Sequence, residues 1–310
     1  MILVTNPTSF VGRAVVRRLA AENLRTRCLV QPSRYEQQLP TGVTFSIASA
    51  TFDDVPALHE AMQGVTAVVH LARGEERLEE HRLQDQPLET TNLLEAAQEA
   101  GVTRIIYLSR LGATAASAYP LFRVKGESEV TIHESGLDYT VLRSAVVYGA
   151  NDIFTTRLVM VAKMFPLVLP IPDAGMARFQ PLWVEDLAQC VVAAVDRDDL
   201  IGRTVALGGP EHYTLEQMIH HMLEAAGVRR ALLHVGMPLM QQGNDLLEPF
   251  VVRSPTPDWW LDLAAVGSAT ELGAVPKHFG FEPCRFVQCL SHLRRGRPWR
   301  RDFLRHVLGY

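Results

Sequence analysis

The sequence predicts an α/β fold in which a doubly wound parallel sheet is joined to a smaller C-terminal lobe. Through the first half of the chain, short apolar runs of strand length alternate with segments whose apolar residues recur at the helix period. Beyond residue 150 the chain changes character and becomes rich in proline turns. The 310 residues are enough for one large α/β unit with an appended lobe. Alternating strands and helices favour a parallel sheet with helices on both faces.

The predicted elements follow one another in a regular order. Strands are expected at 2–5, 27–30, 43–48, 67–72, 104–109 and 139–148, with helices near 10–22, 53–63, up to about residue 100, and 121–135. We therefore predict a first domain over 1–150 and a C-terminal lobe over 151–310. A helix at 184–195 and a strand at 204–209 make the segment 184–209 interleave with the end of the sheet. Any ligand should lie at the carboxyl ends of the parallel strands.

Composition and hydropathy exclude several classes of protein. Apolar residues make up 47% and charged residues 21%, which is typical of a globular protein and not of a disordered or fibrous one. Because residues 1–5 already have a strand pattern, we expect no secretory signal peptide. The longest apolar stretch, 158–172, is interrupted by Lys163 and three prolines, so we expect no membrane span. Two roles are still open for this stretch: it could form one wall of a site for a lipophilic ligand, or it could be a membrane-facing patch.

Cysteine and histidine spacing argues against a metal site. The cysteines contain no C-x-x-C pair and have no histidines at zinc spacing, and we interpret them as reduced core thiols; they are Cys28, Cys190, Cys284 and Cys289. His220 and His221 are adjacent on one predicted helix, so they are not spaced to share a metal ion. No metal is predicted.

The net charge of −4 is unevenly distributed along the chain. Residues 291–310 carry six arginines against Asp302, so the rest of the chain is clearly acidic. A basic tail of this kind indicates docking on something anionic, such as a partner protein, lipid headgroups, nucleic acid or the acidic body itself. The simpler alternative, which we favour, is an amphipathic terminal helix that packs back with its arginines in solvent.

Several phrases in the same order resemble one known group of proteins. They are MILVTNPTSFVGRAVVRRL, AVVHLA, IIYLSRLGA, KGESEVTIHESGLDYTVLRSAVVYG, RFQPLWVEDLAQCVVAAV and GRTVALGGPEHYTLEQM. Together they resemble the atypical short-chain dehydrogenase/reductase superfamily, in particular the branch that holds the NmrA-like proteins and the nucleotide-binding accessory subunit of respiratory complex I. The resemblance covers residues 1 to about 225 and implies a doubly wound Rossmann sheet of the extended type. It also implies an NAD(P)-binding-type domain at 1–150.

The opening turn departs from the pattern of these relatives. They usually have T-G-A-T-G-F-V-G where this chain has residues 5–12, TNPTSFVG. Gly12 is retained and permits close packing of helix on strand. Asn6 tolerates the left-handed conformation, but Ser9 places a side chain where the backbone would approach a diphosphate, and Pro7 lacks a backbone donor. We expect NADP(H) to bind weakly or not at all.

The other expected cofactor contacts have also changed. No Asp or Glu lies between Arg25 and Arg34 to hold a ribose hydroxyl, which argues against NAD selectivity. Arg34 is a candidate for a 2′-phosphate, with an ordinary surface arginine as the alternative. Ser49 stands where relatives often have an adenine-facing Asp. The resemblance implies the following cofactor-contacting positions: Thr8, Phe10, Val11, Gly12, Gln31, Arg34, Ser49, Leu71, Ala72, Ser109, Lys125 and Val146.

The catalytic motif is incomplete. Relatives use Tyr-x-x-x-Lys, and Lys125 matches the Lys, but Leu121 stands at the Tyr position. Tyr119 is two residues further away, which places it on a different side of a helix. Ser109 matches the strand-end Ser. Lys125 could act as the general acid or base, which is the role that the resemblance to isoflavone-reductase-like relatives implies for this lysine. The alternative that we favour is a lysine on the outer face of the helix, paired with Glu127, Glu129 or solvent.

These observations lead to three hypotheses about function. The first is an accessory, assembly or regulatory subunit of a redox or membrane-associated complex, with decayed cofactor and catalytic motifs. The second is an NADPH-dependent reductase or isomerase of a lipophilic small molecule, using Lys125 and Ser109. The third is a regulatory binder that senses NADP(H). We expect a protein partner and not nucleic acid, with membrane-surface contact through residues 291–310 and a small lipophilic ligand as open alternatives. The expected location is cytoplasmic, including the periphery of a membrane complex. The resemblance implies that His70, at the end of a strand, is packed and hydrogen-bonded, with a catalytic role as the alternative.

Overall fold

The computed structural model describes residues 1–32, 38–72, 84–164, 167–172, 177–247, 258–294 and 299. The chain divides into two compact units. The first unit comprises Met1–Ser144, Val184–Leu207 and Ala274–Phe281. The second comprises Ala145–Trp183, Gly208–Gly273 and Glu282–Tyr310.

The first unit is built on a parallel sheet that has seven strands in the described residues. They are β1 (Ile2–Thr5), β2 (Thr26–Val30), β3 (Ser46–Ser49), β4 (Ala67–Leu71), β5 (Arg104–Arg110), β6 (Asp138–Ser144) and β11 (Arg203–Leu207). The strand order is β3-β2-β1-β4-β5-β6-β11, and every neighbouring pair is parallel. The order reverses between β1 and β4, which is where doubly wound sheets bind ligands. The predicted fold class is confirmed.

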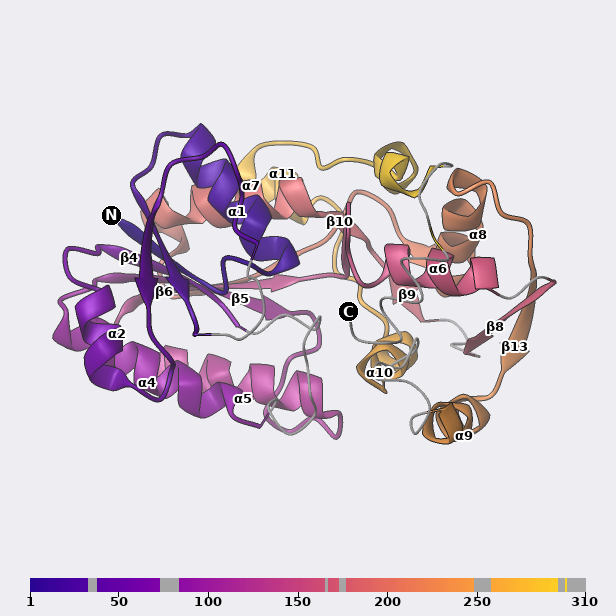
Figure 1. Cartoon of the computed structure of the whole chain (residues 1–310), viewed down its shortest axis with the longest axis horizontal. Coiled ribbons are helices and arrows are strands. Elements are labelled where there is room, and N and C mark those ends of the chain that lie inside the picture. The colour runs from indigo at the N-terminus through magenta and orange to yellow at the C-terminus, as the bar shows by residue number, and fades with distance from the viewer. Residues whose placement is uncertain are drawn as a thin grey trace. The chain divides into compact units, whose positions relative to one another are not determined.

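Helices cover both faces of this sheet (Figure 1). On one face lie α1 (Phe10–Ala21), α7 (Val184–Ala193) and α11 (Ala274–Phe279). On the other face lie α2 (Val55–Ala61), α4 (Gln86–Glu99) and α5 (Pro120–Glu134). Each of these six helices buries apolar side chains, as those of α1 show in Val15, Val16 and Leu19.

Helix starts follow from local sequence. Asp54 caps α2, where its carboxylate accepts a hydrogen bond from the Ala57 amide at 3.0 Å. Prolines in the first turns of α2, α4 and α5 are placed where a missing N–H costs nothing. The core between the sheet and α2, α4 and α5 is mostly aliphatic and contains two buried aromatic residues, Phe52 and Tyr107, of which Tyr107 is fully buried.

The predicted strand at 139–148 is divided in two in the structure. β6 ends at Ser144, whose carbonyl accepts a hydrogen bond from the Leu111 amide at 3.0 Å. After two residues, β7 (Val147–Tyr148) pairs with β10 (Leu182–Trp183) in a separate small sheet. A continuous apolar pattern cannot reveal a change of pairing partner, so the sequence could not locate this break.

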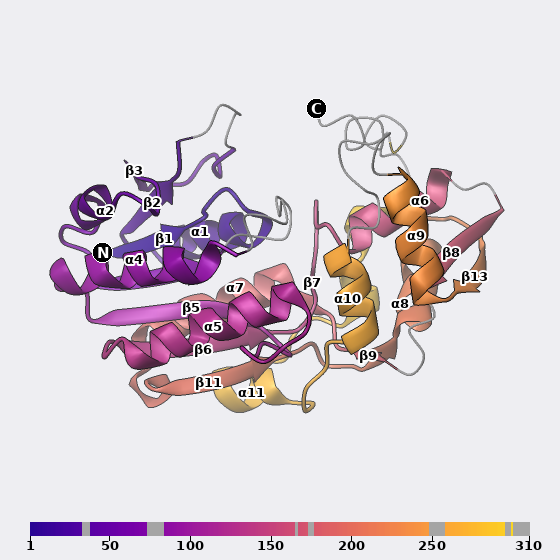
Figure 2. The same ribbon diagram turned by 90° about the horizontal axis from the view of Figure 1, so that it is seen from below.

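The second unit combines short ribbons with four helices in its described residues (Figure 2). The helices are α6 (Thr155–Met164), α8 (Leu215–Ala225), α9 (Met237–Leu247) and α10 (Asp258–Val266). Besides β7 and β10, β9 (Arg178–Phe179) pairs with β12 (Tyr213–Thr214), and β8 (Val168–Pro172) pairs with β13 (Ala231–Val235). Of the predicted basic tail, only residues 291–294 and 299 lie within the described residues. Trp299 is buried, and the Lys163 ammonium lies 4.9 Å from its ring centroid.

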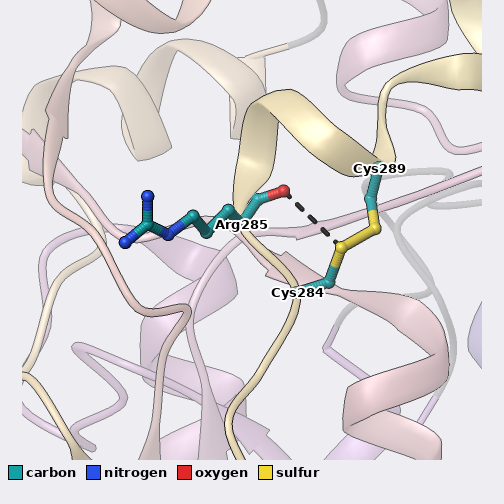
Figure 3. Close-up of a disulfide and its surroundings, with 3 residues drawn as sticks. All are labelled: Cys284, Arg285 and Cys289. Atoms are coloured by element: carbon teal, nitrogen blue, oxygen red, sulfur yellow. Dashed lines mark hydrogen bonds between the residues drawn. A yellow bond between two sulfur atoms is a disulfide. The ribbon is translucent and has the colours of Figure 1, made fainter.

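The prediction that all cysteines are reduced is wrong for two of them. Cys284 and Cys289 form a disulfide (Figure 3). It closes the short turn that holds Phe286, which packs edge-on against Tyr148 at 4.8 Å between ring centroids. Spacing rules for metal and redox motifs do not identify such a pair, because its geometry depends on the local turn. Cys28 and Cys190 are free and buried, as predicted, and burial raises the pKa of the Cys28 thiol to about 12.

None of the helices in the described part of the chain has the length and apolar character needed to span a bilayer. Nor do the described residues contain a cluster of side chains suited to hold a metal ion.

Candidate functional site

The opening turn between β1 and α1 is held by its own backbone. Asn6 adopts a positive φ of 47°, as expected from the sequence. Gly12 lies directly against this turn, because a Cβ built at Gly12 would be 2.2 Å from the Asn6 carbonyl oxygen. Gly12 is therefore required for the approach of helix to turn, whether or not a ligand binds.

Ser9 caps the helix that would face a diphosphate. Its hydroxyl accepts a hydrogen bond from the Gly12 amide at 3.0 Å, and its carbonyl accepts one from the Arg13 amide at 3.0 Å. The Arg13 guanidinium in turn donates to the Thr8 carbonyl at 2.6 Å. In dinucleotide-binding sites these first-turn amides donate to the phosphates. In this structure Ser9 occupies one of these donors, and Pro7 has none.

The point where the strand order reverses is closed by hydrogen bonds between β1 and β4. The Asn6 side-chain amide donates to the Leu71 carbonyl at 2.6 Å. The Thr5 hydroxyl accepts from the Leu71 amide at 2.9 Å and lies 3.0 Å from the Leu71 carbonyl. These bonds join the two strand ends at the place where a cofactor would enter the sheet edge.

His70 is a packed residue, as predicted. Its ring lies between two hydroxyls, with Thr5 Oγ1 at 3.1 Å from Nδ1 and Thr90 Oγ1 at 3.3 Å from Nε2. It also stacks on Tyr107 with 5.4 Å between ring centroids. Burial, and after it the charge of Lys125, lower the pKa of His70 to about 3. His70 is therefore neutral at physiological pH and supports the ends of β1 and β4.

Lys125 is buried on α5, so the expectation that it lies on the outer helix face is wrong. Its side chain is 7% exposed, and its ammonium lies 5.8 Å from the Tyr107 ring centroid. Leu121, at the position of the family tyrosine, is fully buried and brings no hydroxyl to the site. Tyr119 precedes the helix as its N-cap residue and therefore cannot replace that tyrosine on the helix face.

A buried ionic cluster lies at the end of β5, and it was missed by the sequence reasoning. The Ser109 hydroxyl donates to Glu129 Oε1 at 2.5 Å. Arg143 Nη2 donates to Glu129 Oε2 at 2.5 Å, and Arg143 Nε lies 2.9 Å from Oε1. Glu129 is 2% exposed, whereas the Arg143 side chain is 33% exposed. Glu129 follows Lys125 by four residues, so the two side chains share a helix face. This spacing was the one signal in the sequence that could have placed Glu129 near the candidate site.

This cluster changes what Ser109 can do. A serine that activates a carbonyl must direct its proton at that carbonyl. Here the proton is directed at a buried carboxylate, which is itself held by a two-point contact with Arg143. The same contact raises the pKa of Arg143, so the guanidinium stays charged. Ser109 thus joins β5 to α5 and β6 in this structure.

The remaining predicted cofactor positions are distributed as follows. Phe10, Leu71 and Gly12 are buried, whereas Thr8, Val11, Gln31 and Ala72 are half-buried and Ser49 is exposed at the end of β3. Val146 belongs to the second unit. Arg34 lies outside the described residues. The structure therefore brings Ser109, Lys125 and His70 to one group of buried side chains around Tyr107 and Glu129.

Comparison with known proteins assigns the family. A model of the NAD(P)H-binding family matches residues 8–179, which include Thr8–Gly12 of the opening turn, Ser109 and Lys125. The chain belongs to this family. The recognition of an atypical short-chain dehydrogenase/reductase is confirmed by this match and by the relatives described next.

Two curated relatives illustrate the range of this family. The chain is 27% identical over 231 residues to "NADH dehydrogenase [ubiquinone] 1 alpha subcomplex subunit 9, mitochondrial" of Arabidopsis thaliana, covering 71% of this chain and 56% of that protein. It is 23% identical over 301 residues to "Photosystem II assembly factor Ycf39" of Synechocystis sp., covering 94% of this chain and 89% of that one. The matches to the first relatives span less than two thirds of their lengths.

Solved structures show the same fold. One is an NADPH-dependent quinone oxidoreductase, QOR2, complexed with NADPH, from Escherichia coli. The two chains superpose with a TM-score of 0.75 at 21% identity, covering 94% of this chain and 99% of that one. At this level of identity the likeness concerns the fold alone.

Proposed function

We propose that this protein is an accessory or assembly subunit of a membrane-associated redox complex and is not an oxidoreductase in its own right. The observation that carries the proposal is the hydrogen bond from Ser109 to Glu129. It commits the one family hydroxyl still present at the end of β5 to a contact inside the protein, and the family tyrosine is replaced by buried Leu121.

The relatives support the same role. One of them is named as a subunit of NADH dehydrogenase and another as a photosystem II assembly factor. The first name describes a subunit and the second an assembly factor. We propose a corresponding protein partner here, a location at the periphery of a membrane, and a contribution of the basic residues 291–310 to that contact.

For the cofactor, we propose weak binding of NADP(H) or none. The support is Ser9, whose hydroxyl already accepts the Gly12 amide hydrogen that a phosphate would otherwise receive. If a nucleotide binds, Arg34 is the proposed contact for a 2′-phosphate. The domain from 1 to 150 would then provide the nucleotide-binding half, and the C-terminal lobe the surface for the partner.

A second candidate function rests on the burial of Lys125. The Lys125 ammonium is buried beside the Tyr107 ring, and a lysine at this place could act as a general acid. The protein would then be an NADPH-dependent reductase or isomerase of a lipophilic molecule. The replacement of the tyrosine and the engagement of Ser109 make this the second choice.

Genetic complementation separates the two functions. Deleting the gene in its own cell should lower the amount of an assembled membrane-bound redox complex, measured on native gels. Lys125→Met should restore the complex if the role is assembly, and Lys277→Met, at an exposed lysine, serves as the control.

A turnover assay supplies the second test. Purified protein should not oxidise NADPH with quinones or enones at ordinary enzymatic rates, for which roughly 10 per second is typical. Turnover of that order, lost in Lys125→Met and kept in Lys277→Met, would establish the reductase and end the proposal.

A further inference from the structure

The disulfide of the second unit is more accessible than the other cysteines of the chain. Cys284 and Cys289 are both half-buried, whereas the free cysteines Cys28 and Cys190 are fully buried. The residue between them, Arg285, has a side chain that is 67% exposed. Exposed disulfides are the ones that react with thiolates in solution. The Cys284–Cys289 bond is therefore open to attack in the folded protein.

The local fold is compatible with both redox forms of this pair. The two cysteines are only five positions apart in the sequence, and such a short ring restricts the unfolded chain less than a long one. Cys284 Sγ lies 3.6 Å from the Arg285 carbonyl oxygen (Figure 3). In the reduced form the Cys284 thiol can donate to this carbonyl. Reduction therefore leaves the new thiol with an acceptor and does not require the unit to unfold.

The turn that the disulfide closes begins a strap that lies against two helices. We define the strap as residues 286–293, which contain the short 3-10 turns η5 (Phe286–Cys289) and η6 (Ser291–Leu293). η5 contacts α8, and η6 contacts both α6 and α8. The apolar anchors of the strap are each at most 2% exposed; they are Phe286, Leu290 and Leu293. His292 adds a polar contact, with Nε2 at 3.0 Å from Thr155 Oγ1 on α6.

Phe286 is the anchor that the disulfide constrains directly, because it stands inside the ring that the two cysteines close. Its own ring lies 4.8 Å from the ring centroid of Tyr148 and 5.5 Å from that of Tyr213. When the disulfide is reduced, the turn gains conformations, which favours local unfolding in which Phe286 leaves these two rings. Residues 294–310, with most of the arginines of the basic tail, directly follow the strap. Opening of the strap therefore also loosens the attachment of the tail.

We propose that Cys284 and Cys289 form a thiol–disulfide exchange site whose redox state controls the opening of the strap. The reductant is a dithiol. One of its thiolates attacks Cys289 Sγ, the bond to Cys284 breaks, and Cys284 leaves as a thiolate that takes up a proton. The second thiol of the reductant attacks the mixed disulfide and releases Cys289, so the dithiol becomes a disulfide, and two electrons and two protons pass to the cysteine pair. Exchange and opening are properties of the purified chain and do not depend on the assembly role.

Thiol labelling of the folded full chain tests the exchange. The chain is treated with dithiothreitol as the dithiol, labelled with N-ethylmaleimide and analysed by peptide mass spectrometry. Cys284 and Cys289 should be labelled at least about tenfold faster than the buried Cys28 and Cys190, and neither should be labelled without dithiothreitol. Labelling of all four cysteines at one rate would show that the disulfide opens only when the protein unfolds, and would overturn the proposal. Labelling of Cys284 and Cys289 without dithiothreitol would overturn it as well.

Limited trypsin digestion tests the control of the strap. Reduction should raise the rate of cleavage after Arg285 about tenfold, the order expected when a ring of this size is opened. Cleavage after Arg229, an exposed arginine of the same unit, is the matched control and should not change. The double variant Cys284→Ser, Cys289→Ser should be cleaved like the reduced wild type, with or without dithiothreitol.

One result would end the proposed control even if exchange occurs. It is equal cleavage after Arg285 in the oxidised and the reduced wild type, because the disulfide would then not hold the strap closed. This comparison uses the wild-type chain alone, so it stands even where the double variant does not fold. Neither the labelling nor the digestion changes the outcome of the turnover and complementation tests.

Discussion

Replacing Ser9 by glycine should restore part of the affinity for NADPH. In the structure the Ser9 hydroxyl accepts the Gly12 amide hydrogen at 3.0 Å, so a phosphate oxygen must displace it to gain that donor. A hydrogen bond of this kind contributes about 1 kcal/mol net, and removing the competition should therefore lower the Kd for NADPH about fivefold. Removal of the side chain also opens the approach of a diphosphate to the backbone, which adds to the gain.

The cost to the folded protein should be small. Changing an N-cap serine to glycine lowers the free energy of unfolding by only a few tenths of a kcal/mol, whereas changing it to alanine costs about 1 kcal/mol. Ser9→Ala is therefore the informative control, because it frees the same Gly12 amide but keeps the Cβ atom. We expect a smaller gain in affinity for Ser9→Ala than for Ser9→Gly.

Thermal shift with increasing NADPH measures both effects at once. The melting temperature without ligand reports the loss of the cap, and its rise with ligand concentration reports the Kd, since a ligand that binds only the folded state stabilises it by mass action. NADH serves as the comparison for 2′-phosphate recognition. If wild-type protein already bound NADPH as tightly as Ser9→Gly, the capping hydroxyl would not be the obstacle, and the reasoning about the opening turn would fail.

Three further predictions concern the scaffold of the site. Glu129→Gln should lower the free energy of unfolding by about 1–3 kcal/mol, because it leaves Arg143 without its carboxylate. Urea unfolding measures this free energy. The control is Glu127→Gln, at a half-buried glutamate two residues earlier, which should change the free energy of unfolding little. Gly12→Ala should leave little folded protein, since its Cβ would lie 2.2 Å from the Asn6 carbonyl oxygen, and wild-type levels of folded variant in circular dichroism would contradict this. His70 is neutral when folded, with a pKa of about 3, whereas an unfolded histidine binds a proton below about 6.5. Between these values the unfolded state binds more protons, so stability should fall as pH decreases, by up to about 1.4 kcal/mol per pH unit, and His70→Gln should show a shallower slope.

The fold was predictable from the sequence because its signals are local and repeated. Apolar runs alternating with helix-period segments specify a parallel sheet, and right-handed crossovers leave few arrangements for it. The conformation of Asn6 was predictable for the same reason, since few residues adopt a positive φ readily. The packing of His70 was correctly expected from the resemblance, because relatives with a histidine at this place have it packed and hydrogen-bonded.

The site itself was predictable only in part. Ser109 and Lys125 were found by motif, but their partners depend on which strands and helices meet in space. Glu129 looked like one of several acids on an amphipathic helix, and Arg143 like an ordinary strand residue, but the packing of α5 on β5 and β6 places them together. The disulfide between Cys284 and Cys289 was missed because it depends on the geometry of a tight turn.

Two family residues that survive in this chain, Gly12 and Ser109, make contacts within the fold itself. Gly12 is retained because the helix touches the Asn6 carbonyl, and Ser109 is retained at a place where it joins β5 to the Glu129 and Arg143 pair. Ser9 and Leu121 stand at positions where the relatives have other residues. Retention of Gly12 therefore carries no information about nucleotide binding, because the same glycine would be kept in a protein that binds none. The positions that separate a working reductase from an accessory subunit are the ones whose only role would be to contact the cofactor or substrate.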